Sequence, residues 1–361
     1  MTAGDSPARP AGRERTRSFA QRIVAWQRAH GRNELPWQNT RDAYRIWLSE
    51  IMLQQTQVTT VLPYYERFLT RFPDVRALAA ASEDDVLAHW AGLGYYSRAR
   101  NLHRAAQQVV ARHGGHFPAD VEQLNALPGV GRSTAAAIAA FAHDVIAPIL
   151  DGNVKRVLAR HAAIAGFPGL ATVERRLWAT ATARLPERRG DMVAYTQGLM
   201  DLGSAVCVKR APRCDTCPVR TDCRALAEGL TDQLPTPRPR KVLPEREQRY
   251  LLLRHGDDVL LVKRPAPGIW GGLWCLPELA TDDTAINICA HFGATRVTAG
   301  PTLAPIHHCF THFRLTLNIV AMQTTRCDRH RSPPGALWLA LADAPRAALP
   351  KPVATLLAAL N

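Results

Sequence analysis

Four cysteines gathered in one short segment constrain this chain more than any other feature. They are Cys207, Cys214, Cys217 and Cys223, and their spacing is C-x6-C-x2-C-x5-C. Four thiolates this close together are typical ligands of a soft metal centre, either an iron–sulfur cluster or zinc. Structural zinc sites usually have two separated C-x2-4-C knuckles, whereas this segment has one C-x2-C pair. The spacing therefore favours a [4Fe–4S] cluster over zinc, and over a set of unligated buried thiols.

The N-terminal segment helps to predict the cellular compartment, which in turn decides whether disulfides are expected. Residues 1–17 are basic but lack the apolar core of a secretory signal, and we interpret them as a disordered basic arm. No stretch of the sequence is long and apolar enough to cross a bilayer. We expect a cytoplasmic, nucleoid-associated protein without membrane contact, in which disulfides are disfavoured. The other cysteines are then free thiols: Cys275, Cys289, Cys309 and Cys327.

The charge of the chain indicates a polyanionic partner. Its formal net charge is +14 and its sequence pI is about 9.9. DNA or RNA is the leading partner for a protein this basic, ahead of acidic membranes. A basic surface that serves only solubility is the alternative.

The hydrophobic pattern divides the 361 residues into regions of different character. Apolar residues recur at helical spacing through 18–229, which predicts an all-α domain that includes the cysteine segment 207–223. Residues 230–247 are rich in proline and basic side chains and are typical of an extended linker. Residues 248–361 predict an α+β domain. Its expected strands are RYLLLRH and VLLVKRP around a Gly-Asp-Asp turn, then FRLTLNIVAMQ and ALWLAL, and its expected helices are TAINICAHFG and PVATLLAALN.

A glycine-rich turn from Leu127 to Gly131 leads directly into an alanine-rich helix. Gly129 and Gly131 permit a tight turn with positive φ. The free N–H groups at the start of the helix, beside Arg132 and Ser133, can bind a phosphate of any sequence. The pattern predicts a DNA-binding helix–hairpin–helix in a chain this basic, with an ordinary interhelical turn as the alternative.

Asp151 lies between an apolar stretch and the start of another helix. The commonest use of an aspartate at that place is as a helix N-cap. A functional aspartate can cap the helix with one oxygen while its carboxylate faces a cleft. Lys155 and Arg156 then offer charge to phosphates.

Glu50 is the second candidate carboxylate, on a helix that we expect to run from Trp47 to Gln57. On such a helix Glu50, Gln54 and Gln57 share one face, and Gln55 points elsewhere. A glutamate among apolar neighbours should have a raised pKa and can donate a proton. An exposed glutamate on an amphipathic helix is the alternative.

Five features together resemble the adenine-DNA glycosylase family, a branch of the helix–hairpin–helix base-excision glycosylases. They are WLSEIMLQQTQV, GLGYYSRARNLH, LPGVGRSTA, ILDGNVKRVLAR and the four-cysteine spacing. The resemblance covers nearly the whole helical block. It implies a multidomain enzyme whose all-α glycosylase domain carries one [4Fe–4S] cluster of structural function.

The resemblance implies roles for both carboxylates. Glu50 would protonate the adenine leaving group, and Asp151, oriented by Asn153, would stabilise the oxocarbenium-like sugar. Cleavage of an N-glycosidic bond requires both functions, and two carboxylates with different pKa values supply them. Relatives that resemble endonuclease III carry a Schiff-base lysine where this chain has Ser133. We therefore expect hydrolysis of the base without efficient strand cleavage.

The resemblance also implies how the duplex is opened. Gln54 and Gln55 would fill the space left by the flipped adenine, and Tyr95 would wedge beside the opposing base. Core packing is the alternative for either Tyr95 or its neighbour Tyr96. Further expected DNA contacts are Gly129, Gly131, Arg132, Ser133 and Lys155, with Lys209, Arg210 and Arg213 as candidates in the cysteine loop.

The second domain resembles the Nudix fold found at the C-terminus of the same family, through the run GIWGGLWCLPE. A working Nudix hydrolase has a glutamate pair that binds Mg²⁺ where this chain has Ala290 and His291. We therefore expect the domain to recognise 8-oxoguanine and not to hydrolyse nucleotides. The expected recognition loop is His307–Phe313, in which many relatives have Phe-Ser-His at the positions of Phe310, Thr311 and His312. Ordinary sheet residues are the alternative.

The sequence thus predicts a monomeric glycosylase that removes adenine opposite 8-oxoguanine or guanine from double-stranded DNA. A glycosylase/lyase for oxidised pyrimidines is one rival, and Ser133 argues against it. A non-catalytic, redox-sensing DNA-binding protein is another, and the presence of both Glu50 and Asp151 argues against it. Ala290 and His291 argue against a third, an active nucleotide pyrophosphatase.

Overall fold

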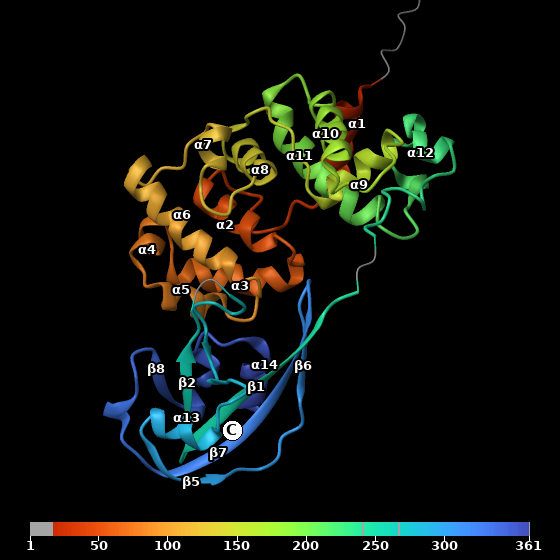
Figure 1. Cartoon of the computed structure of the whole chain (residues 1–361). Coiled ribbons are helices and arrows are strands. Elements are labelled where there is room, and N and C mark those ends of the chain that lie inside the picture. Colours follow the sequence, from red (N-terminus) through yellow and green to blue (C-terminus); the bar gives the residue numbers. More distant parts are fainter. Residues whose placement is uncertain (1–16, 240–241, 266–267, 361) are drawn as a thin grey trace, which may run out of the picture. The chain divides into compact units, whose positions relative to one another are not determined.

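The computed structural model describes residues 17–239, 242–265 and 268–360 (Figure 1). The described residues form two compact units. The first unit takes its residues from Met1–Ile46, Ala119–Asn125 and Gly131–Arg238. The second takes its residues from Trp47–Pro118, Ala126–Val130 and Pro239–Asn361. Both units contain helices of the glycosylase-like segment, and the second also contains the sheet.

The first unit is helical around an apolar core, as the periodicity predicts. Its helices are α1 (Phe19–His30), α7 (Val121–Asn125), α8 (Arg132–His143), α9 (Gly152–His161), α10 (Ala171–Thr182), α11 (Met192–Asp201) and α12 (Arg224–Ala227). A π-helical turn, Leu202–Val206, follows α11 and leads into the cysteine loop, which contains short 3-10 turns at Cys214–Thr216 and Arg220–Asp222. Ile23, Val154, Leu158 and Leu177 are fully or almost fully buried in this core. Among the described residues, no helix combines the length and apolar character needed to cross a membrane.

Helices of the second unit surround large buried aromatic side chains. They are α2 (Ala43–Leu53), whose first turn belongs to the other unit, α3 (Val58–Arg71), α4 (Val75–Ala80), α5 (Glu83–Trp90) and α6 (Ser97–His113). Trp47, Tyr65, Phe68 and Trp90 are each at most 1% exposed. Burial of such side chains contributes most of the stabilisation of a helical core.

The end of α2 corrects one prediction. The helix ends at Leu53 and does not continue to Gln57, and Gln55 has a φ of 58°. Glu50, Gln54 and Gln57 therefore do not share a helical face. The physical reason is non-local, because Arg98 of α6 binds the carbonyl oxygens of Ile51, Met52 and Gln54 and satisfies them without further helix.

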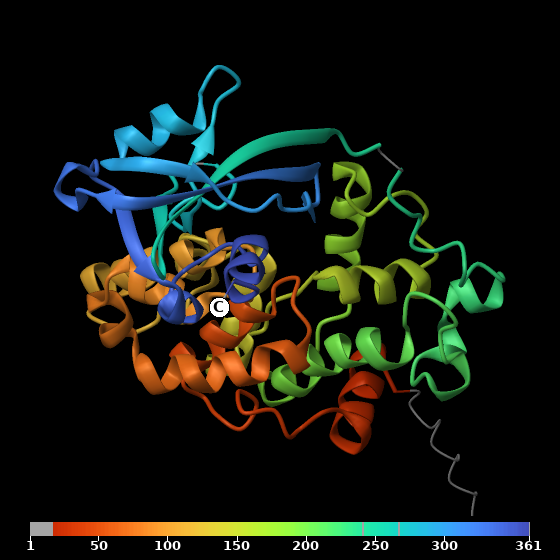
Figure 2. The same ribbon diagram turned by 90° about the horizontal axis from the view of Figure 1, so that it is seen from below.

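The described residues of the Nudix-like part form a mixed, eight-stranded sheet. Its strands are β1 (Glu245–His255), β2 (Asp258–Lys263), β3 (Trp274–Cys275), β4 (Glu278–Leu279), β5 (Ala294–Ala299), β6 (Ile306–Cys309), β7 (Arg314–Cys327) and β8 (Ala336–Ala340). The principal order is β3-β2-β1-β7-β5, with β4 beside β1, β6 beside β7 and β8 beside β2. β1 and β7 are parallel, and the other pairs are antiparallel. Figure 2 shows α13 (Ala285–His291) and α14 (Lys351–Ala358) on opposite sides of the sheet.

Local sequence signals predict this part well where turns are short. β1 and β2 form the expected hairpin, and Gly256 in its turn has a φ of 60°. Both expected helices, α13 and α14, are confirmed, as are strands β7 and β8. The strands β3, β4, β5 and β6 were not predicted, because they are short or lack a clear apolar alternation.

Candidate functional site

The glycine-rich turn has the geometry of a hairpin between two packed helices. The N–H of Val130 donates to Leu127 O at 3.1 Å, and Gly129 has a φ of 78°. A Cβ at Gly129 would lie 2.8 Å from the Cβ of Asn101, so a side chain there is excluded by space as well as by φ. Gly131 differs from the prediction, because its φ is −88° and it serves as the extended N-cap of α8. α7 and α8, which flank the turn, pack against each other.

Ser133 is tied to the segment that carries Asp151. Its Oγ accepts the backbone N–H of Leu150 at 2.9 Å, one residue before the aspartate. The hydroxyl therefore fixes the chain at the entry to α9 and leaves this position without an amine nucleophile. Arg132, on the exposed start of α8, stacks on the ring of Trp178 with its guanidinium carbon 3.9 Å from the ring centroid.

Asp151 is the N-cap of α9, as its place in the sequence predicts. Its Oδ1 accepts the N–H of Val154 at 2.7 Å. Burial raises the pKa of Asp151, although backbone N–H groups and the charges of Arg156 and Lys155 oppose the rise. The site therefore holds a desolvated carboxylate whose protonation is easier than that of an ordinary aspartate.

The cations that follow Asp151 are already engaged. Lys155 Nζ lies 2.6 Å from Glu174 Oε1 in a partly exposed ion pair. Arg156 donates to Asn153 Oδ1 at 2.8 Å and to the carbonyl oxygens of Gly203 and Cys207 at 2.6 and 2.7 Å. The guanidinium of Arg156 thus binds backbone carbonyl oxygens next to the cysteine loop, and a contact between Arg156 and phosphates stays a prediction.

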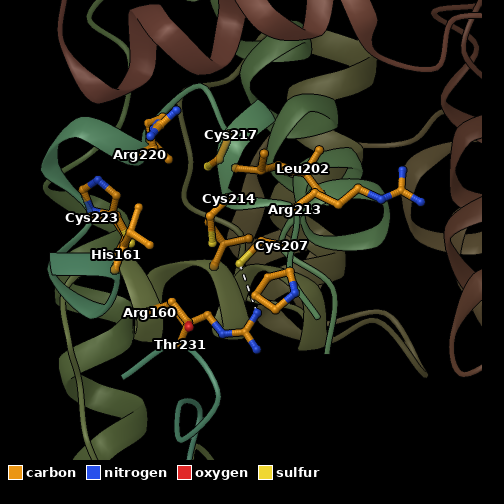
Figure 3. Close-up of a pocket in the computed structure, with 15 residues that line it drawn as sticks. Arg160, His161, Leu202, Cys207, Arg213, Cys214, Cys217, Arg220, Cys223 and Thr231 are labelled. Atoms are coloured by element: carbon orange, nitrogen blue, oxygen red, sulfur yellow. Dashed lines mark hydrogen bonds between the residues drawn. The ribbon is translucent and has the colours of Figure 1, made fainter. Parts of the chain in front are cut away.

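The four predicted metal-ligating cysteines line one pocket, together with apolar side chains and a buried arginine (Figure 3). Arg160, 2% exposed, donates to Cys207 Sγ at 3.4 Å and to Val208 O and Lys209 O at 2.7 and 3.1 Å. In the described part of the chain, no three His, Cys, Asp or Glu side chains form a group that could hold a metal ion. The sulfurs thus surround a shared space and do not converge on one point. A pocket that brings together four thiols, apolar side chains and the Arg160 donor to Cys207 Sγ fits an anionic thiolate-bound cluster, which is larger than a single ion. Figure 3 also shows Arg213 pointing away from the cysteines.

A second pocket brings together the residues expected to open the duplex. Gln54, Gln55, Tyr95 and Gly129 all line it, and Gln54 Nε2 donates weakly to Gly129 O at 3.4 Å. Tyr95 is 43% exposed and has a φ of 48°. Its neighbour Tyr96 is half-buried and donates its hydroxyl hydrogen to Leu349 O, so one tyrosine of the pair packs inside and the other faces solvent. Sequence reasoning missed Arg98, which also lines this pocket and is only 7% exposed.

Glu50 is half-buried on the last turns of α2, three residues before the helix ends. It does not line the pocket of Gln54 and Tyr95. Glu50 belongs to the second unit and Asp151 to the first, so the two carboxylates are carried by separate compact bodies.

The expected recognition loop is shorter than predicted. His307, His308 and Cys309 are in β6, paired with β7, so only the residues from Phe310 to Phe313 form the turn. The rings of Phe310 and Phe313 stack at a centroid distance of 4.6 Å with an interplanar angle of 24°. Thr311 and His312 are exposed at the tip, with Thr311 Oγ1 3.5 Å from His312 Nδ1. An aromatic base thus supports two exposed polar side chains.

Comparison with known proteins gives a consistent result. Residues 48–182 match the HhH-GPD superfamily of base excision DNA repair proteins, and residues 249–359 match the NUDIX domain. The chain is 33% identical over 344 residues to the adenine DNA glycosylase of Buchnera aphidicola subsp. Acyrthosiphon pisum, with 94% of this chain and 96% of the relative covered. It is 34% identical to the adenine DNA glycosylase of Homo sapiens, with 89% of this chain and 70% of the relative covered.

A solved structure of a thermostable thymine-DNA glycosylase is also similar, at 27% identity and a TM-score of 0.53. The matched region covers 58% of this chain and 95% of the solved chain. The similarity to that structure therefore extends over little more than half of the molecule, whereas the adenine DNA glycosylases match along nearly all of it.

Proposed function

The chain belongs to the adenine DNA glycosylase family, and we propose that it removes adenine paired with 8-oxoguanine or guanine without cleaving the strand. Membership makes it a DNA glycosylase of base excision repair, a hydrolase of N-glycosyl bonds with adenine as the released base. The observation that carries the finer proposal is the half-buried Asp151, whose chain segment is held by a serine at the position where a lyase has a lysine.

The proposed chemistry divides between two carboxylates. Glu50 donates a proton to the leaving adenine, which makes the base a better leaving group. Asp151 stabilises positive charge on the sugar as the N-glycosidic bond breaks, and a water molecule then adds to C1′ and loses a proton, which completes the hydrolysis. The N-cap bond to Val154 and the arginine-bound Asn153 hold the chain around Asp151 in place, so little rearrangement accompanies the reaction.

Ser133 limits the product to an abasic site. A lyase forms a Schiff base through an amine at this position, and a hydroxyl bonded to Leu150 N–H cannot replace it. We expect sodium borohydride to trap no stoichiometric covalent enzyme–DNA complex. A stoichiometric trapped complex would contradict this part of the proposal.

Cys207, Cys214, Cys217 and Cys223 hold a [4Fe–4S] cluster in the proposed enzyme. The cluster supplies structure by ordering the loop between α11 and α12. Support comes from the shared pocket of the four thiols and from the Arg160 donor to Cys207 Sγ. Analysis of purified protein should find four iron atoms and four acid-labile sulfides per chain. Zinc without sulfide would contradict the assignment.

In the proposed enzyme, residues 18–229 carry out the chemistry, residues 230–247 link the two domains and residues 248–361 recognise 8-oxoguanine. Support for the last role is the exposed Thr311–His312 tip on its Phe310–Phe313 base. Hydroxyl and imidazole groups can donate and accept hydrogen bonds at the edge of an oxidised base.

The test is a single-turnover assay on duplexes that hold adenine opposite 8-oxoguanine, guanine or thymine. Strand breaks should arise only after alkaline treatment, and fastest opposite 8-oxoguanine. Equal rates opposite 8-oxoguanine and thymine would contradict the recognition role. Base loss from none of the duplexes would leave DNA binding as the only activity.

A further inference from the structure

Arg98 joins two turns that lie far apart in the sequence. Its Nη1 donates to Ile51 O, Met52 O and Gln54 O at 3.0, 2.8 and 2.6 Å. Its Nη2 donates to Thr56 Oγ1 at 3.1 Å, and more weakly to Leu93 O and Gly94 O at 3.4 and 3.3 Å. In the described part of the chain, the acceptors of Arg98 are carbonyl and hydroxyl oxygens. One guanidinium thus holds the Gln54–Thr56 turn and the Leu93–Gly94 turn.

The stability of its own helix does not account for this arginine. Arg98 is the second residue of α6, where the positive end of the helix dipole disfavours a cation. The side chain is also 7% exposed, and burial lowers its pKa to about 10. The carbonyl oxygens at the C-terminal end of α2 offset these penalties, because they carry the negative end of that dipole.

The turns held by Arg98 contain the two strained residues of the pocket. Gln55 has a φ of 58° and Tyr95 a φ of 48°, in the left-handed region that non-glycine residues rarely adopt. The guanidinium carbon of Arg98 lies 5.5 Å from the ring centroid of Tyr95, and the Arg98 N–H donates to Tyr95 O at 2.8 Å. Such backbone conformations persist only where surrounding contacts determine them, and Arg98 supplies contacts on both sides.

We propose that Arg98 is a positioning residue that holds the Gln54–Gln55 turn and Tyr95 ready to enter the duplex as adenine leaves it. This inference rests on the proposed function and deepens it. Flipping a base out of the stack costs a few kcal/mol, and inserted side chains offset this only if they are already placed. Arg98 acts on the opening of the duplex and touches neither the reacting sugar nor the leaving base.

The test compares Arg98→Met and Arg98→Lys with the matched control Arg112→Met. Arg112 is an exposed arginine about 21 Å further along α6. Single-turnover adenine release is measured on two duplexes with adenine opposite 8-oxoguanine. In one duplex the flanking pairs are matched, and in the other they are mismatched, which lowers the cost of flipping. A 2-aminopurine beside the adenine reports unstacking by its fluorescence.

Arg98→Met should slow adenine release about 30-fold on the matched duplex and less than about 3-fold on the mismatched one. It should also reduce the fast rise in 2-aminopurine fluorescence, while Arg112→Met leaves both unchanged. Arg98→Lys should fall between, because an ammonium cannot span both turns with a planar fork of donors. Equal slowing on both duplexes, with normal fluorescence, would overturn the positioning role.

Two further measurements keep the test decisive. Circular dichroism and thermal melting show whether Arg98→Met folds. If it does not, the ratio of adenine-release rates on the two duplexes is measured with Arg98→Lys. The effects of Arg98→Lys and Tyr95→Ala on the matched duplex should be clearly less than additive, because both act on one wedge. Fully additive effects would contradict the inference. Failure of the proposed function is distinct, since wild-type protein would then release no adenine from either duplex.

Discussion

The start of α9 and the turn between β6 and β7 differ in how firmly their functional groups are held. Asp151 caps its helix through a 2.7 Å bond, and its neighbours Leu150 and Asn153 are fixed by Ser133 and Arg156. Thr311 and His312 are exposed, and the one contact described between their side chains is 3.5 Å long. In the proposed enzyme this difference fits the two roles, because a charged transition state requires a preorganised group, whereas recognition of an opposing base can use side chains that adjust on binding.

Among the variants considered, Asp151→Asn is expected to cause the largest loss of adenine release. The amide keeps the N-cap but removes the negative charge that stabilises the sugar cation, so adenine release should fall about 1000-fold. Single-turnover assays measure the fall, and fluorescence anisotropy should show nearly unchanged duplex binding. The control Asp232→Asn replaces an exposed aspartate of the same unit and should remain fully active. Residual activity within about tenfold of wild type would remove Asp151 from the chemistry.

Replacement of Thr311 and His312 by alanine should alter selectivity and leave the chemistry intact. Release opposite 8-oxoguanine should slow about 10- to 100-fold, equivalent to losing one or two hydrogen bonds, with little change opposite guanine. Thr298→Ala, at an exposed position of β5, is the matched control. The two opposing bases are compared at one protein concentration under single turnover. A parallel loss opposite both bases would mean that the turn does not discriminate between them.

The pH dependence of release should report the environment of Asp151. Burial raises its pKa, so the carboxylate becomes protonated, and inactive, at a higher pH than an ordinary aspartate would. As pH falls, activity should therefore be lost above the usual range for this residue type. Lys155→Met removes a positive charge that lowers this pKa, so the loss should move to still higher pH. The control Lys209→Met replaces an exposed lysine of the cysteine loop and should leave the pH profile unchanged. A pH profile of Lys155→Met identical to that of the wild type would contradict the assignment.

Glu174→Gln should have the smallest effect of these variants, and it should act on duplex affinity. It frees Lys155 from a 2.6 Å ion pair, so duplex affinity at low salt should rise about two- to threefold. The slope of log affinity against log salt concentration should steepen by up to about one. Glu228→Gln, which breaks the exposed 3.2 Å pair with Arg224, is the control. An unchanged affinity and slope would mean that Lys155 makes no phosphate contact.

The sequence predicted the features that depend on neighbouring residues. Asp151 as an N-cap, the hairpin at Gly256 and the helices α13 and α14 all follow from local patterns. The end of α2 did not, because the acceptor for Arg98 at Gln54 is 44 residues away in the chain. The engagement of Arg156 with Cys207 O, 51 residues distant, was missed for the same reason. The roles of these two arginines could not be predicted because their hydrogen-bond acceptors lie far away in the sequence.

Hydrolysis of the base without strand cleavage can be measured in a single experiment. Free adenine and broken strands are counted at the same time points in a single turnover on a duplex with adenine opposite 8-oxoguanine. We expect one adenine released per strand, with breaks only after alkali, and much slower release when thymine replaces 8-oxoguanine. Strand breaks that form before alkali as fast as adenine is released would show that Ser133 does not prevent lyase chemistry, and would rule out the proposed monofunctional hydrolysis.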